Sequence, residues 1–206
     1  MDNLVRPVLL REQIKGVTFM LSVAFLFENK QLDFPTACQS NNTNCGSTSV
    51  QTMLAYYGID ERQESLDKKL KLSKDGVSYT NMIKVFEKNG LKTSSGRMNQ
   101  EMLKSFLDKN TPVIILIQAY KDGKNKTYTR DGYKDGHYVT VTGYDDTKFI
   151  VEDPSLNNKI GYIPFSELDI RWHGIGQNEK EKLDFYGLAV YGKEPKYELG
   201  KLTKVK

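Results

Sequence analysis

The order of helix-like and strand-like patterns along this chain predicts an α+β fold, in which N-terminal helices pack on an antiparallel sheet. Apolar residues recur at helical spacing over residues 44–108, whereas residues 112–191 contain runs rich in β-branched and aromatic side chains. Helices followed by clustered strands indicate α+β architecture, since a doubly wound parallel sheet would alternate the two. A length of 206 residues is sufficient for one domain with a full hydrophobic core.

We expect this domain to span residues 32–192, between an N-terminal extension (1–31) and a lysine-rich C-terminal tail (193–206). A hydrophobic content of 38% and a charged content of 27% are those of an ordinary globular protein. The net charge of +4 permits weak association with an anionic membrane surface and does not indicate a nucleic-acid partner. The sequence contains no phosphate-binding, dinucleotide-binding or zinc motif of recognised spacing, so we expect no cofactor and no metal.

The extension contains a mostly apolar run, Val17–Phe27, preceded by Arg6, Arg11 and Lys15. Its eleven residues are too few for a transmembrane helix, which needs about 20. We expect instead a helix packed on the domain. A basic start followed by an apolar run is also typical of a signal peptide or a membrane-surface anchor, although no small-x-small cleavage site follows Leu26. A cytoplasmic location is therefore favoured, with a secreted or membrane-associated protein as the alternative.

The first helix is predicted to begin at Cys45 and to end before Gly58. Four residues at positions i, i+3, i+4 and i+7 mark one buried face: Val50, Met53, Leu54 and Tyr57. Gly58 lies where a left-handed C-cap is expected, and Asn44 is a suitable N-cap.

The remaining elements follow from caps, breakers and apolar runs. Three more helices are predicted, over 62–72, over 81–88 with Gly90 as the C-cap, and over 100–108 after an Asn99 cap. Five strands are predicted, of which the first is a continuous apolar run: 112–118, 137–143, 149–152, 159–163 and 185–191.

Cys45 is the most informative residue of the chain. A thiol in the first turn of a helix lies among unpaired backbone N–H groups, at the positive end of the helix dipole. Both favour the thiolate, and helix N-termini lower a cysteine pKa from about 8.5 toward about 3.5–7.5. We therefore interpret Cys45 as a nucleophile. The alternative, an inert structural cysteine, would more naturally lie in the middle of the helix on its apolar face.

His137 is the expected base. Apolar residues alternate around a polar turn within residues 137–152, which predicts a β-hairpin. A two-residue turn would place His137 opposite Pro154, whereas a bulge or a three-residue turn would place it opposite Asp153. Either register brings the Asp153 carboxylate near the imidazole, where it can fix the tautomer and stabilise the imidazolium. The alternatives are a packed strand histidine and an aspartate that only forms a turn before proline.

Gln39 is the expected oxyanion donor. It lies six residues before Cys45, in a polar stretch that can fold back beside the helix start. There its side-chain amide can join the Cys45 backbone N–H, and one such donor stabilises a transition state by about 3 kcal/mol. A surface role is the alternative for Gln39. The second histidine, His173, follows Trp172 in a loop-like stretch, and we expect a core tryptophan and a loop histidine outside the site.

These residues occur in the order Gln39, Asn44-Cys45-Gly46, His137, Asp153-Pro154. The spacing is six residues from Gln39 to Cys45 and sixteen from His137 to Asp153. In this pattern the chain resembles the bacteriocin-processing cysteine peptidases, a papain-like family that cuts double-glycine leader peptides. The resemblance spans residues 32–191.

The resemblance implies a papain-like fold in which Cys45 is the nucleophile, His137 the general base and acid, Asp153 the orienting carboxylate and Gln39 the oxyanion donor. Ser47 and Thr48 depart from the proline and small residue that many relatives carry after Cys-Gly. The sequence also carries neither the membrane spans nor the ATPase that usually follow such a peptidase, so we expect a stand-alone member.

The residue set predicts a thiol hydrolase, most directly a cysteine peptidase that acts through a Cys-His-Asp triad and an acyl-enzyme on a peptide or an acyl-thioester. Two alternatives stay open: an acyltransferase or transpeptidase that uses the same acyl-enzyme, and a catalytically silent domain that binds peptides. Cys38 is expected to be a buried small hydrophobe, with a disulfide to Cys45 as the redox alternative. Residues 121–136 form either a substrate-covering loop or an ordinary solvated one, and their aspartates argue against single-stranded nucleic acid.

Overall fold

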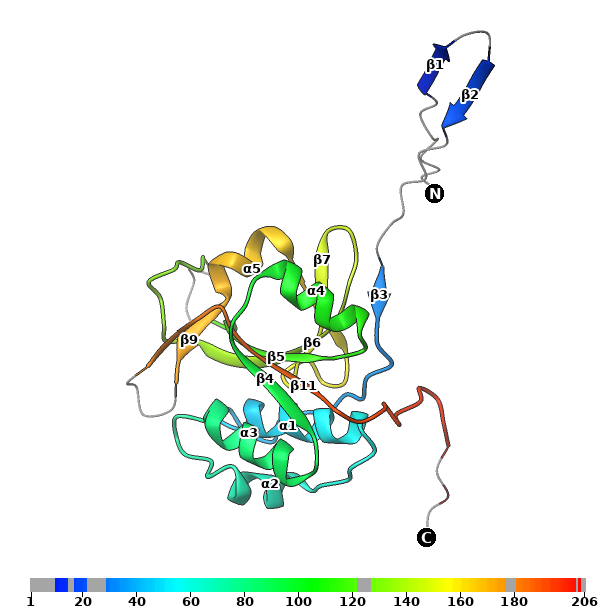
Figure 1. Cartoon of the computed structure of the whole chain (residues 1–206). Helices are drawn as coiled ribbons and strands as arrows, with labels where there is room; N and C mark the ends of the chain where they lie inside the picture. The colour runs from blue at the N-terminus through cyan, green and yellow to red at the C-terminus, as the bar shows by residue number, and fades with distance from the viewer. Residues whose placement is uncertain are drawn as a thin grey trace.

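The computed structural model describes residues 10–14, 17–21, 29–121, 127–176, 181–202 and 204. Its centre is a seven-stranded antiparallel sheet in the order β4-β11-β5-β6-β7-β8, with β3 paired to β6 (Figure 1). The strands are β3 (Lys30–Gln31), β4 (Lys92–Arg97), β5 (Val113–Gln118), β6 (Gly136–Tyr144), β7 (Lys148–Glu152), β8 (Ile160–Pro164) and β11 (Tyr186–Tyr191). A separate two-stranded sheet pairs β9 (His173–Ile175) with β10 (Lys182–Asp184).

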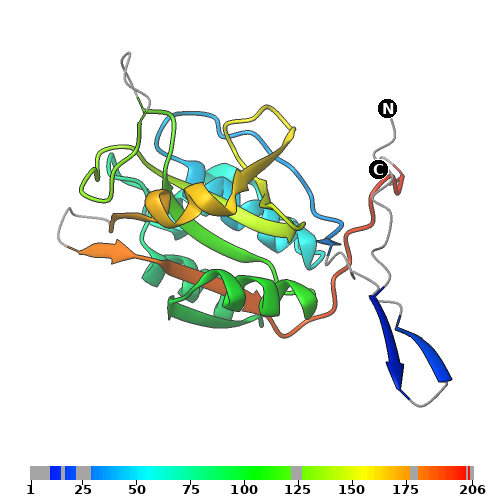
Figure 2. The same cartoon turned by 90° about the horizontal axis from the view of Figure 1, so that it is seen from above.

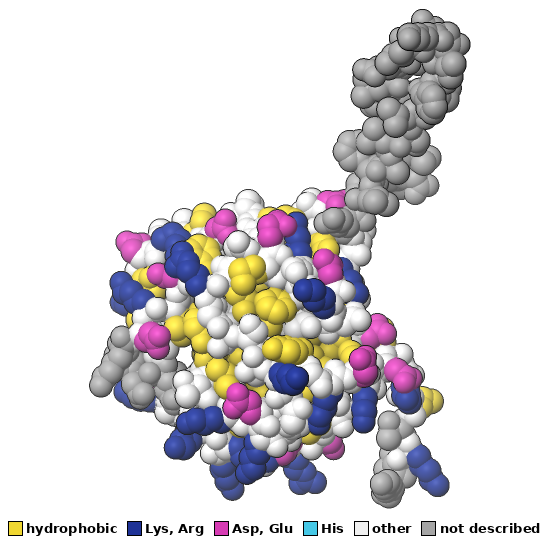
Figure 3. Space-filling view, viewed as in Figure 1, with side chains coloured by type: hydrophobic (Ala, Val, Ile, Leu, Met, Phe, Trp, Pro, Cys, Tyr) yellow, Lys and Arg dark blue, Asp and Glu magenta, His cyan; other side chains and the backbone are white. Residues whose placement is uncertain are grey.

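Five helices surround this sheet within the described residues: α1 (Cys45–Tyr56), α2 (Gln63–Lys69), α3 (Tyr79–Lys88), α4 (Gln100–Asp108) and α5 (Phe165–Arg171). Figure 1 shows α1, α2 and α3 on one side of the sheet and α4 and α5 on the other, and Figure 2 shows the same layers from above. The α+β prediction is confirmed. Exposed lysines gather along the edge formed by α2 and α3 (Figure 3): Lys68, Lys69, Lys84 and Lys88.

Helix α1 packs its predicted face into the core. All four members of that face are buried: Val50, Met53, Leu54 and Tyr57. The helix ends as predicted, because Gly58 adopts a left-handed φ of 74° and the Ile59 N–H bonds back to the Leu54 carbonyl at 2.9 Å. Trp172 is fully buried, and its indole N–H donates to the Tyr186 carbonyl at 3.0 Å, so the predicted core role of this residue is confirmed.

Several element boundaries differ from the sequence prediction for local reasons. Helix α4 spans 100–108 with Asn99 accepting from the Met102 N–H, as predicted. Helix α3 begins two residues early, because Ser78 accepts from the Asn81 N–H and caps it there. Helix α2 stops at Lys69 rather than at residue 72, since Lys71 turns into the left-handed region at φ 55°. Strand β4 was not predicted, because its sequence KTSSGR has no apolar alternation.

The predicted N-terminal helix is wrong over residues 17–21. This segment forms strand β2 (Val17–Leu21), which pairs antiparallel with β1 (Leu10–Ile14). Val17, Thr18 and Phe19 are β-branched or aromatic, and such residues favour extended backbone over helix. The rest of the predicted run, residues 22–27, lies outside the described residues. Over the part of the chain that the structure describes, no helix is long and apolar enough to cross a membrane.

Candidate active site

Cys45 is the first residue of α1 and is buried. Asn44 occupies the N-cap position. The prediction that its side chain caps the helix is wrong, because the side chain makes no capping hydrogen bond. The Asn44 amide instead donates to Ser40 Oγ at 2.9 Å and accepts from the Asn41 N–H at 3.2 Å. The Asn44 side chain therefore stabilises the turn over residues 40–44, which precedes α1. This turn positions the helix start, where the Gly46 N–H of the first turn hydrogen-bonds the Cys45 thiol.

His137 reaches Cys45 from the sheet, on strand β6. Its Nε2 lies 2.7 Å from Asp153 Oδ1, and both side chains are buried. The other ring nitrogen, Nδ1, is therefore the one available to the thiol, and Cys45 is hydrogen-bonded to the His137 side chain. The structure thus brings the sulfur, the imidazole and the carboxylate together, with the imidazole bonded to both of the others.

The hairpin register that creates this contact is neither of the two we considered. A bulge between Val141 and Gly143 shifts the ladder, which ends with Thr140 opposite Glu152. Continuing that register sets Asp153 opposite Val139 rather than opposite His137. His137 and Val139 lie on the same face of the strand, so Asp153 meets His137 as a diagonal cross-strand neighbour. The predicted proximity of Asp153 and His137 holds, whereas both registers that we considered are wrong.

The Asp153 carboxylate accepts two further hydrogen bonds besides that from His137. Its Oδ1 also accepts from the Ser155 N–H at 2.9 Å, which makes Asp153 a turn former as well as a partner of His137. Its Oδ2 accepts from the Tyr120 hydroxyl at 2.7 Å. Burial raises the pKa of Asp153, but His137, the Ser155 N–H and the Tyr120 hydroxyl outweigh burial and hold it below its usual value. The carboxylate is therefore ionised where it meets the imidazole.

The thiol and the imidazole shift each other's pKa toward an ion pair. Burial raises the pKa of Cys45, but the hydrogen bond and charge of His137, with the backbone N–H groups of Tyr138 and Gly46, bring it below its usual value. Burial lowers the pKa of His137, yet Asp153 and Cys45 raise it to about 9. Both shifts favour the thiolate–imidazolium pair over the neutral thiol and imidazole.

Gln39 lies beside the segment that follows Asp153. Its N–H donates to the Pro154 carbonyl at 3.0 Å, and its Oε1 accepts from Ser155 Oγ at 3.0 Å. Its Nε2 donates to the Asn41 carbonyl at 2.8 Å. These hydrogen bonds fold residues 39–41 back toward the helix start, and one of the two amide N–H groups of Gln39 makes no hydrogen bond among the described residues.

A cleft of about 710 Å³ opens at Cys45. Its walls come from the turn before α1, the segment before α3, the loop before β6 and strand β9; they include Thr43, Gly76, Val77, Leu116, Tyr133, Tyr138 and Ile175. A second hollow, of about 390 Å³, is lined by Asp153 and Tyr120 among others. Cys45 and Asp153 therefore border different hollows.

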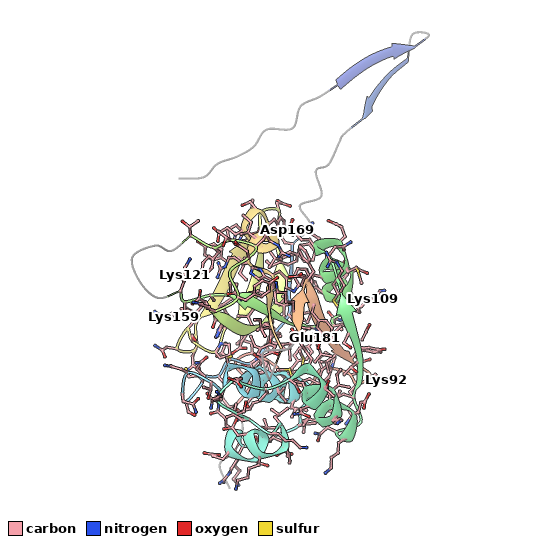
Figure 4. All side chains as sticks on the ribbon, turned by 90° about the vertical axis from the view of Figure 1, so that its left-hand side faces the viewer. Lys92, Lys109, Lys121, Lys159, Asp169 and Glu181 are labelled. Carbon is pink, nitrogen blue, oxygen red and sulfur yellow. The ribbon has the colours of Figure 1, made fainter. Side chains whose placement is uncertain are left out.

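The loop before β6 is fixed by His173 and Arg130. The His173 Nε2 donates to the Gly132 carbonyl at 2.7 Å, and Arg130 donates to the backbone carbonyl of Asp169 at 3.0 Å; Figure 4 labels Asp169 on α5. His173 is fully buried at the start of β9, not in a loop as we expected, and burial lowers its pKa. Since the described part of this loop lines the cleft, His173 supports a cleft wall and lies outside the Cys45–His137–Asp153 cluster.

Cys38 also differs from the prediction. It is exposed rather than buried, and its thiol faces Asn158 Oδ1 at 3.5 Å. The polar residues around it keep this stretch at the surface. Both cysteines are free thiols in this structure, so the disulfide alternative is not present.

A profile of the Peptidase_C39 like family matches residues 31–180. The chain belongs to this family. The Transport/processing ATP-binding protein ComA of Streptococcus pneumoniae is 24% identical to this C39-like chain over 137 residues, which are 66% of the chain but only 17% of ComA.

Solved structures share the papain-like peptidase fold of this C39-like chain. A protein described as a C39-like peptidase from Bacillus anthracis superposes with a TM-score of 0.61 at 18% identity, covering 82% of this chain and 100% of the other. A double glycine motif protease from an AMS/PCAT transporter, in complex with the leader peptide, gives 0.58 at 21% identity, covering 79% and 95%. The peptidase domain of Streptococcus ComA gives 0.56 at 16% identity, covering 77% and 98%.

Two residues of this C39-like site escaped the sequence analysis. Tyr120 follows the end of a buried strand, and Glu152 immediately precedes Asp153 in a strand. Glu152 is buried, and its carboxyl accepts from the Ala37 N–H at 3.4 Å and bonds Thr52 of α1 at 3.3 Å. The available signal in the sequence was the position of both residues at or just after the end of a buried strand, where polar side chains often belong to functional sites.

Proposed function

We propose that this C39-like chain is a cysteine peptidase that cuts a peptide through Cys45, His137 and Asp153. The observation that carries the proposal is the buried cluster of thiol, imidazole and carboxylate, with 2.7 Å between His137 and Asp153 and with Cys45 lining an open cleft. Lowered thiol pKa and raised imidazole pKa are the arrangement a thiolate nucleophile requires.

In this mechanism the Cys45 thiolate attacks the carbonyl carbon of the scissile amide and forms a tetrahedral intermediate. The carbon–nitrogen bond then breaks, and the His137 imidazolium gives its proton to the departing amine. The product is a thioester between Cys45 and the acyl half of the peptide. Water attacks this thioester, His137 takes a proton from the water, and a carboxylic acid leaves while the Cys45 thiolate re-forms. Asp153 keeps His137 in the orientation and tautomer that both proton transfers need.

The proposed oxyanion donors are the backbone N–H of Cys45 and the amide of Gln39. The position of Cys45 at the start of α1 supports the first, because this N–H has no partner inside the helix. The hydrogen bonds of Gln39 to Ser155 and Asn41 support the second, since they fix the amide and leave one N–H for a ligand. Removal of one such donor lowers kcat about 10²–10³-fold in enzymes of this type.

The substrate that we propose is a peptide with two glycines before the scissile bond. The family assignment supports a peptide substrate, and one protein that shares the fold is a double glycine motif protease with its leader peptide. The cleft at Cys45 combines apolar walls with charged groups, including Lys74, Asp75 and Asp131. The domain that carries this activity is the one proposed over residues 32–192.

The test is to incubate the protein with peptides that contain a Gly-Gly site and with matched peptides in which both glycines are replaced by alanine. Mass spectrometry of the products should show cleavage after the second glycine, faster than for the alanine series. Cys45→Ala should abolish cleavage, and Cys38→Ser, the matched thiol control, should leave the rate unchanged. Failure of the wild-type protein to cleave any of these peptides, with Cys45 intact, would contradict the proposal.

The same experiment separates the remaining alternatives. Repeated with an added amine, it yields only free acid if water is the acceptor, whereas an amide formed from the acyl fragment and the added amine identifies an acyltransferase. Binding of peptides without any product identifies a silent binding domain.

A further inference from the structure

Tyr120 lies two residues after the end of β5 and contacts both members of the Asp153–His137 pair. Its hydroxyl donates to Asp153 Oδ2 at 2.7 Å, and its ring meets the imidazole edge-on, with 5.1 Å between centroids and 89° between planes. Asp153 Oδ1 is already used by His137 and by the Ser155 N–H. Tyr120 is therefore the donor that the described part of the chain supplies to the second carboxylate oxygen.

The backbone of Tyr120 is held in an unfavourable conformation. Its φ is 55°, in the left-handed region that bulky residues rarely adopt. Residues kept in this region cost about 1–3 kcal/mol each and persist only where surrounding contacts fix them. Here both neighbours are fixed, because the Ala119 N–H donates to the Asp135 carbonyl at 2.9 Å and the Lys121 N–H to the Tyr128 hydroxyl at 3.3 Å. Figure 4 shows Lys121 at the edge of the domain, where the chain leaves β5.

Tyr120 also separates the imidazole from open space. Its side chain is 51% exposed and lines the 390 Å³ hollow beside Asp153, whereas His137 behind it is buried. Water that reached the bond between an imidazolium and a carboxylate would weaken it, because their attraction falls as the local dielectric constant rises. Because the Tyr120 ring lies edge-on against the imidazole, it shields the His137–Asp153 bond from water in the hollow.

We propose that Tyr120 is a positioning residue of this site, which fixes the Asp153 carboxylate through its hydroxyl and shields the Asp153–His137 bond through its ring. The proposal rests on the proposed function, since it assigns Tyr120 a role in the same Cys45 chemistry. A shielded carboxylate stabilises the His137 imidazolium, and the imidazolium in turn stabilises the Cys45 thiolate. Tyr120 therefore controls the pH at which the nucleophile forms without touching the sulfur.

Two substitutions separate the hydroxyl from the ring. Tyr120→Phe keeps the ring and removes the donor, and Tyr120→Leu removes both. Tyr162→Leu is the matched control, because Tyr162 is 64% exposed on β8, lines the same hollow, and pairs with Lys148 rather than with Asp153. Both positions are exposed enough for the three variants to fold, and near-unchanged circular dichroism spectra should confirm this.

The first readout is the rate at which iodoacetamide alkylates Cys45 as a function of pH, in a Cys38→Ser background. We expect the midpoint of the acidic limb to rise by about one pH unit in Tyr120→Leu, by less in Tyr120→Phe, and not at all in the control. The second readout is peptide cleavage, for which Tyr120→Phe should lower kcat about tenfold at constant KM, the effect of one lost hydrogen bond to a charged group. Tyr120→Leu should lower kcat further.

The proposal would be overturned if both Tyr120 variants showed the same alkylation midpoint and the same kcat as the wild-type protein. A rise in KM alone would also overturn it, because it would make Tyr120 a substrate contact rather than a positioning residue. The alkylation assay needs no peptide substrate. A protein that cleaves no peptide but shows the shifted midpoints would therefore contradict the proposed function while supporting the role of Tyr120.

Discussion

The Glu152→Gln variant should be more stable than the wild-type protein, by a margin that grows as the pH rises. Glu152 is 1% exposed, and its carboxyl bonds the Ala37 N–H on one side and Thr52 of helix α1 on the other. Burial and the neighbouring Asp153 charge raise its pKa to about 8, although the Ala37 and Thr52 hydrogen bonds lower it. At neutral pH the folded protein therefore keeps a proton on Glu152. Glutamine has nearly the same shape as this protonated acid and, like it, offers both a hydrogen-bond donor and an acceptor.

The magnitude follows from the two pKa values of this carboxyl. An unfolded glutamate releases its proton near pH 4.5, whereas the folded one retains it to about pH 8. Between these values the unfolded chain binds fewer protons, so the free energy of unfolding of the wild-type protein falls as pH rises. At pH 7 this deficit is about 3 kcal/mol, from 1.36 kcal/mol per pH unit over the interval above 4.5. Glutamine does not titrate, so Glu152→Gln should be about 3 kcal/mol more stable at pH 7 and nearly equal at pH 4.

Urea denaturation followed by circular dichroism at several pH values from 4 to 8.5 measures this difference. Other titrating groups, including His137 and Cys45, are common to both proteins and cancel in the comparison. Glu101→Gln is the matched control, because the Glu101 side chain is 81% exposed, and it should show no pH-dependent difference. A difference between Glu152→Gln and wild type that stays constant with pH, or a variant that is less stable at pH 8, would refute the reasoning. Either result would mean that the folded protein holds Glu152 as a paired carboxylate.

Three further predictions follow from contacts near the site and in the helices. At pH 6 iodoacetamide should alkylate Cys45 readily, and His137→Ala should slow this reaction, because burial then raises the thiol pKa without an opposing charge; the rate is followed by mass spectrometry. Gly46→Ala should destabilise the fold by about 1–3 kcal/mol and lower activity, because the added Cβ would clash with Val77 Cγ2; thermal unfolding measures the loss. Asn99→Ala should cost about 1 kcal/mol of stability, because it removes the side-chain cap of α4, with activity unchanged.

Each of these has its own control. Exposed Cys38 should be alkylated more slowly than Cys45 at pH 6, and equal rates would argue against an activated thiol. Gly136→Ala introduces a Cβ whose nearest neighbour is Leu116 Cδ1 at 3.7 Å, an ordinary contact, so it should be tolerated where Gly46→Ala is not. An Asn99→Ser variant keeps a capping oxygen and should retain most of the wild-type stability.

Features that depend on neighbours in the chain could be predicted from the sequence. The apolar face of α1 and its glycine end follow from local periodicity and backbone preference, and Gly58 takes the left-handed conformation that was expected. The strand over residues 113–118 is fully buried, as its continuous apolar run indicated. The start of a helix at Cys45 also follows from local pattern, and that position alone identifies the thiol as unusual. The N-terminal segment shows the limit of this approach, since an apolar run with β-branched residues fits either a helix or a strand.

Features that depend on contacts between distant segments were decided only by the tertiary structure. A single bulge in β6 set the register that makes Asp153 a diagonal neighbour of His137, and no local pattern fixes where a bulge falls. The Tyr120 hydroxyl meets Asp153, 33 residues later in the chain, only because β5, β6 and β7 lie side by side in one sheet. The raised pKa of Glu152 likewise comes from burial beneath α1, a packing contact with Thr52 across 100 residues. Sequence determined which residue types are present and which short elements they form; the enclosure that turns them into a site arises from long-range packing, because burial and charge act through space rather than along the chain.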